Sequence, residues 1–134
     1  MEILREIEQR LAKYPELKYE IKGNSITVFP ASDNGFKVAL YAGDQSSYEP
    51  YDVYFDGWHE PFSDKDEALN CFVFGLTSEC RVKELSRGKQ IYEWTVEYLI
   101  DGEWQADSTT ALIFFQFWRK RKVRYLQNNL QLRG

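Results

Sequence analysis

Residues 92–106 read YEWTVEYLIDGEWQA, and this stretch decides the fold class. Large apolar side chains stand at alternate positions, with Glu93, Thr95 and Glu97 between them. That period of two is typical of a strand with one buried face. Asp101 and Gly102 then give the two-residue signature of a hairpin turn. The stretch therefore predicts antiparallel strands joined by a tight turn.

Two amphipathic segments predict helices near residues 2–13 and 64–77. In the first, the aliphatic residues fall on one stripe, and Pro15 marks the end of the helix. The second begins at a capping-box pattern in which Ser63 or Asp64 stands three residues before an acid. Its apolar face includes Cys71, which we expect to be an inert, buried thiol.

The remaining pattern predicts further strands. They are expected at residues 17–22, 25–29, 36–42, 51–55, from residue 80 onward, and at 103–106. Residues 56–62 are expected to form a loop, and Asp107-Ser108 an interruption. Residues 109–118 are apolar on both faces and predict a central strand, followed by an exposed turn at 119–122 and a strand at 123–126 that pairs back on it.

This order predicts one α+β domain over residues 1–134. We expect a single curved antiparallel sheet of about seven or eight strands with both helices packed on one face. Each half opens with a helix and continues with hairpins, which hints at a weak pseudo-repeat.

Composition narrows the class of protein. The apolar share of 43% and aromatic share of 16% exclude intrinsic disorder. The longest apolar run is too short for a membrane span, and the first residues lack the pattern of a signal peptide. The missing leader pattern favours a cytoplasmic location. Two cysteines are too few for a disulfide framework, so in that reducing compartment we expect free thiols.

Charge is unevenly distributed along the chain. Residues 1–118 hold 11 basic and 21 acidic groups, a net charge of −10, whereas residues 119–134 hold six basic groups and no acid. Only the segment 118–125 could attract nucleic acid. Its binding candidates are Trp118, Arg119, Arg121 and Tyr125, which would hold phosphates by charge and bases by stacking. The simpler interpretations, which we favour, are a solvated hairpin tip or a segment that pairs with the acidic body.

His59 is the single histidine and lies between Trp58 and Glu60. A histidine beside an acid can act as a general base, so His59 and Glu60 are weak catalytic candidates. The simpler interpretation is a half-exposed loop histidine, with Trp58 and His59 available for binding. Calcium-loop, phosphate-loop and nucleophile motifs are missing from the sequence, so we expect no metal and no cofactor.

Tyrosine and tryptophan are more numerous than one small core can bury with their polar atoms satisfied. We therefore expect a non-catalytic binding or interaction module with an aromatic groove, whose partner is a protein or a small apolar or aromatic ligand. Two alternatives stay open: an enzyme of unknown reaction that uses His59 and nearby acids, and a nucleic-acid binder through residues 118–125. Nucleic acid ranks last because the body is acidic. No membrane partner is expected, and a homodimer stays open.

Overall fold

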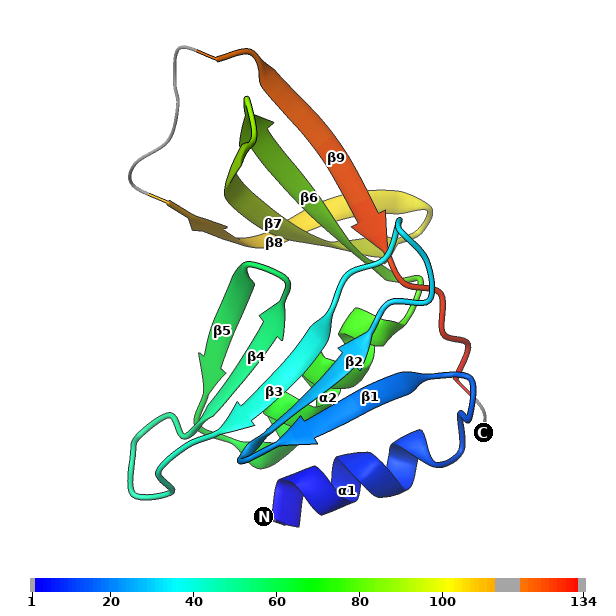
Figure 1. Ribbon diagram of the computed structural model, residues 1–134, viewed down its shortest axis with the longest axis vertical. Helices are drawn as coiled ribbons and strands as arrows, with labels where there is room; N and C mark the ends of the chain where they lie inside the picture. The colour runs from blue at the N-terminus through cyan, green and yellow to red at the C-terminus, as the bar shows by residue number, and fades with distance from the viewer. Residues whose placement is uncertain (1, 113–118, 133–134) are drawn as a thin grey trace.

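The computed structural model describes residues 2–112 and 119–132, and in this part of the chain it is α+β, with two helices and two antiparallel sheets (Figure 1). The elements follow in the order α1 (Glu2–Leu11), β1 (Lys18–Lys22), β2 (Ser25–Phe29), β3 (Val38–Ala42), β4 (Tyr51–Phe55), β5 (Trp58–Phe62), α2 (Lys65–Leu76), β6 (Cys80–Arg87), β7 (Gln90–Ile100), β8 (Glu103–Ala111) and β9 (Arg121–Gln127).

The first sheet is a meander in which β1 to β5 pair with their neighbours in chain order. The predicted turn at Gly23 and Asn24 joins β1 to β2, and Gly23 supplies the left-handed φ of 59° that this turn requires. Alternate residues of the inner strands, such as Val28, Leu40 and Val53, are buried. One face of this sheet therefore lies against the core.

Both predicted helices form and pack on that buried face. Asp64 is the N-cap of α2, because its carboxylate accepts a hydrogen bond from the Glu67 amide at 3.0 Å. Gly75 lets α2 approach β4 closely, since a Cβ at this position would overlap the ring of Phe55. Lys65 Nζ lies 3.4 Å from a carboxylate oxygen of Glu6 and so links the two helices.

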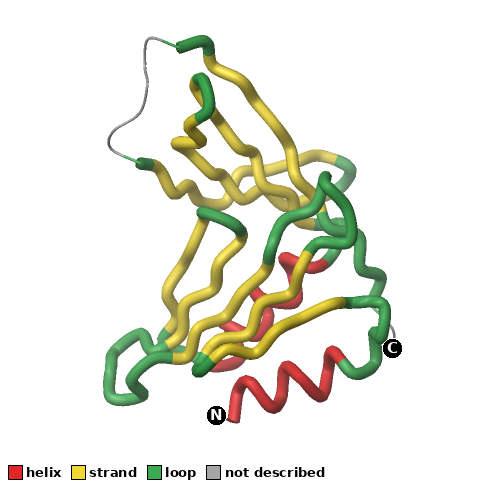
Figure 2. The backbone as a smooth tube through the Cα atoms, viewed as in Figure 1, coloured by secondary structure: helices red, strands yellow, loops and turns green. Residues whose placement is uncertain are grey.

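The second sheet has the order β8-β7-β6-β9. Figure 2 shows both helices beside the first sheet and the second sheet at the other end of the view, where β6 contacts α2. The β4–β5 hairpin joins the two sheets: Gly57 lies against the indole of Trp94, and Trp58 Nε1 donates to Ser108 Oγ at 3.0 Å. The two sheets are thus connected by packed side chains as well as by the chain.

The expectation of one sheet of about seven or eight strands is wrong. The α2 helix lies between β5 and β6 in the chain, and β6 starts a new sheet instead of extending the first. Residues 58–62 form a strand instead of the expected loop, and the turn before it places Asp56 at φ 52°. An Asp-Gly pair is a known hairpin signal, so the sequence did contain this strand boundary.

Two further corrections concern the C-terminal strands. The strand at residues 121–127 pairs with β6 and not with the strand before it. Residues 109–111 belong to β8 at an edge of the sheet, whereas residues 113–118 of the expected central strand lie outside the described residues. The interruption expected at Asp107 is a bulge, because Val96 pairs with Ser108 and Glu97 pairs with Ala106.

Candidate functional site

The face of the first sheet that points away from the helices is hollowed into a groove of about 600 Å³. Its lining comes from β1 to β4 and their flanks: Glu20, Lys22, Ser25, Thr27, Phe29, Lys37, Ala39, Tyr54 and Asp56. The strand register places Glu20, Thr27, Ala39, Tyr54 and His59 in one row across the sheet. Small side chains at the centre of the row and larger ones at its ends produce the hollow.

Charges of both signs flank the groove. At the β1 edge, Lys22 Nζ lies 3.8 Å from a carboxylate oxygen of Glu20. Near the second sheet, a carboxylate oxygen of Asp56 accepts a hydrogen bond from the Lys37 amide at 2.9 Å. Burial raises the pKa of Asp56, although the charges of Lys37 and Arg124 oppose that shift. A ligand in the groove therefore meets both acidic and basic groups.

The candidates Trp58, His59 and Glu60 do not gather at one site, because successive strand residues point to opposite faces. His59 is exposed on the open face, where its ring stacks on Tyr54 with centroids 5.2 Å apart. Trp58 is only 1% exposed and belongs to the core. Glu60 is half-buried on the same side as Trp58, and burial together with the charge of Asp107 raises its pKa.

Glu84 of β6 is a further acidic residue whose charge interacts with that of Asp56. Glu84 is buried at 7% exposure, and burial followed by the charge of Asp56 raises its pKa, while Arg124 lowers it. Arg124 also donates to the backbone carbonyl of Asp33. Glu84 was not among the predicted site residues, yet its place two residues after Val82 in an alternating strand was a signal that it would face inward.

The basic segment does not form one uniform face. Arg121 and Tyr125 share one face of β9, and strand alternation puts Lys122 and Arg124 on the other. Arg119 is exposed, and its carbonyl accepts a hydrogen bond from Arg87 at 2.9 Å. The remaining candidate, Trp118, lies outside the described residues.

Tyr125 packs on a cation of the neighbouring strand. Its ring centroid lies 4.2 Å from the guanidinium carbon of Arg81, which lies 4.3 Å from the ring centroid of Trp104. Arg81 Nε donates to a carboxylate oxygen of Glu97 at 2.6 Å. This cluster organises the outer face of the second sheet by cation–π contacts and a charge-assisted hydrogen bond.

The two thiols are poor nucleophiles. Burial, followed by the charges of Glu60 and Asp107, raises the pKa of Cys71 to about 12, and burial also raises that of Cys80. Both cysteines are free. At neutral pH they are therefore protonated.

In residues 2–112 and 119–132, no group of three or more His, Cys, Asp or Glu side chains is placed to hold a metal ion. Neither α1 nor α2, the helices of this described part, is long and apolar enough to cross a membrane. No protein-family model, curated protein or solved structure matches this chain, so its own residues carry every inference about its function.

Proposed function

We propose that this chain is a non-catalytic binding module that holds an extended segment of a partner protein in the groove of the first sheet. The observation that carries the proposal is the groove of about 600 Å³ itself, which combines a floor of small side chains with aromatic and charged residues. Its size lies within the range of ordinary binding sites.

The chemistry of the groove favours a polypeptide. Thr27 and Ala39 are small enough for a backbone to approach the sheet closely. Phe29 and Tyr54 offer surfaces of the kind that is enriched at protein interfaces. Charges of both signs can fix the register of a partner, as rim charges do in known complexes.

The enzymatic alternative ranks second. Asp56 lines the groove and has a raised pKa, which suits a general acid. Such a mechanism needs a further group within hydrogen-bond reach of the substrate. His59 and Glu60, the pair first considered, face opposite sides of the sheet, which weakens this alternative.

Nucleic acid ranks third. Glu20 and Asp56 would repel phosphates at the groove, and the basic residues of β9 are divided between two faces. We also infer a cytoplasmic setting, in keeping with the two free thiols.

The experiment compares two variants in which a different alanine is replaced by arginine. Ala39→Arg fills the floor of the groove from a half-buried position, whereas Ala106→Arg places the same side chain on an exposed position of β8. Proteins that bind to the wild-type chain and to each variant are quantified by mass spectrometry. One protein that binds is then purified, and its affinity for each chain is measured by calorimetry. Circular dichroism checks that both variants are folded.

We expect a partner that binds the wild type and Ala106→Arg with equal affinity and binds Ala39→Arg at least about tenfold more weakly, a difference of about 1.4 kcal/mol. Equal retention by all three chains would refute the groove as the site. Binding of RNA or DNA that falls steeply with salt would promote the nucleic-acid alternative.

A further inference from the structure

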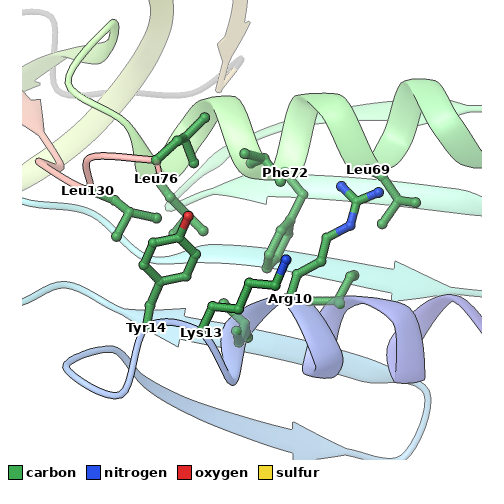
Figure 3. A pocket seen from close by; sticks show the side chains of 11 residues that line it. Arg10, Lys13, Tyr14, Leu69, Phe72, Leu76 and Leu130 are labelled. Carbon is green, nitrogen blue, oxygen red and sulfur yellow. The ribbon is translucent and has the colours of Figure 1, made fainter. Parts of the chain in front are cut away.

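A separate apolar cavity of about 260 Å³ lies between the two helices and the C-terminal segment, residues 128–132 after β9 (Figure 3). Its walls include Ile7 and Leu11 from α1 and Leu69, Phe72 and Leu76 from α2, with Leu130 on a third side. The cavity is on the opposite side of the first sheet from the groove, because α1 and α2 cover the buried face.

The C-terminal segment is fixed where it closes the cavity. The Leu130 amide donates to the Leu76 carbonyl at 2.9 Å, and Leu130 also forms a β-bridge with Thr77. These contacts place an aliphatic wall beside the end of α2. The cavity is therefore formed by the folded chain itself.

Cationic and phenolic groups gather at one side of this cavity. Figure 3 shows Arg10 and Lys13 reaching from the end of α1 toward α2, with the Tyr14 hydroxyl pointing toward Leu76. Arg10 lies 3.5 Å from a carboxylate oxygen of Glu6, and both side chains are partly exposed. A guanidinium has five N–H donors, so one such contact leaves capacity for a second anion.

We propose that this cavity binds a medium-chain carboxylic acid, with its hydrocarbon chain among the leucines and Phe72 and its carboxylate at Arg10 and Lys13. The apolar lining selects hydrocarbon, and the cations at its side complement an anionic head group. This assignment is independent of the proposed groove, which takes a different ligand on a different face.

The volume sets the length of the chain. An engineered apolar cavity of about 150 Å³ accepts benzene, which corresponds to roughly 25 Å³ per carbon. By that measure a cavity of about 260 Å³ accommodates a chain of roughly ten carbons. Decanoate is therefore the probe, and much longer acids should not fit within the cavity.

The experiment is calorimetric titration of the full chain with hexanoate, octanoate, decanoate and tetradecanoate, each below its micellar concentration. We expect affinity to rise about fourfold per methylene up to decanoate and then to stop rising, because each buried methylene adds a fixed transfer free energy until the cavity is full. Decanol, which lacks the carboxylate, should bind at least about fivefold more weakly than decanoate.

Matched variants locate the site. Val73→Trp fills the cavity from a half-buried position of α2, and Val123→Trp makes the same change on an exposed position of β9. The double variant Arg10→Gln/Lys13→Gln removes the cations, with Arg5→Gln on the exposed side of α1 as its control.

We expect Val73→Trp to lose binding of both decanoate and decanol, and the double variant to weaken decanoate at least about tenfold while leaving decanol unchanged. Val123→Trp and Arg5→Gln should bind as the wild type does. Failure of the wild type to bind decanoate at millimolar concentration would overturn the proposal, as would equal binding by Val73→Trp and Val123→Trp. Denaturation midpoints confirm that each variant is folded.

Discussion

Asn128, which directly follows β9, offers the sharpest test of how the molecule is held together. Its side-chain oxygen accepts a hydrogen bond from the Phe36 amide at 3.1 Å. Its side-chain nitrogen donates to the carbonyl of Phe36 at 3.1 Å and to the carbonyl of Gly75 at 2.9 Å. One half-buried amide thus connects the C-terminal segment to the approach to β3 and to the end of α2.

The substitution Asn128→Ala removes all three bonds and leaves three backbone groups to find other partners. A hydrogen bond of this kind contributes about 0.5–1.5 kcal/mol, so the free energy of unfolding should fall by about 2–4 kcal/mol. With an m-value of about 2 kcal/mol per molar urea, the midpoint should fall by about 1–2 M. Asn128→Asp should be at least as destabilising at neutral pH, because a carboxylate would face two carbonyl oxygens.

Urea denaturation followed by circular dichroism measures both variants, and Asn129→Ala is the matched control. Asn129 is the exposed neighbour of Asn128, and its substitution should change stability by no more than about 0.5 kcal/mol. If Asn128→Ala unfolded at the same urea concentration as Asn129→Ala, the reasoning about this three-way connection would be refuted.

Three further predictions concern local features. Asp64→Ala should lower the free energy of unfolding by about 1 kcal/mol through loss of the N-cap, while Ser63→Ala should not; equal midpoints for the two variants in urea would contradict this. Gly57→Ala should cost about 1–3 kcal/mol because its Cβ meets the Trp94 indole, as thermal unfolding and indole fluorescence would report; an unchanged melting temperature would count against that contact. The pKa of Glu84 is higher in the folded state than in the unfolded chain, where a glutamate has a pKa of about 4.3. Ionisation of Glu84 therefore lowers the free energy of unfolding as the pH rises through these two pKa values, and it has no effect at pH values below both. Glu84→Gln should therefore stabilise the protein at pH 7 and lose this advantage below about pH 4 in urea titrations; the same gain at both pH values would exclude ionisation as its cause.

Local features were available from the sequence because they depend on neighbours in the chain. The helices were predicted near residues 2–13 and 64–77 and extend over Glu2–Leu11 and Lys65–Leu76. The stripe of aliphatic residues and the cap at Asp64 are properties of consecutive residues, as is the turn at Gly23. The α+β class followed from the order of these elements.

The strand at residues 58–62 shows where local reasoning failed. Charged and proline residues interrupt its apolar pattern, although the Asp-Gly turn before it was visible. This strand forms because it pairs with β4 and packs on the second sheet. Its own sequence pattern does not indicate a strand. Its alternation then separates His59 from Glu60, which adjacency in sequence had suggested as a pair.

The sequence by itself determined the helices, most strands and the presence of surplus aromatic residues, because these depend on composition and short periodicity. Only the tertiary structure decided that β6 begins a second sheet and that β9 pairs with it across some forty residues. It also decided which side chains form the row from Glu20 to His59 and which close the cavity between the helices. Strand pairing and helix packing join residues far apart in the chain, and no local pattern specifies which distant partner a strand or helix meets.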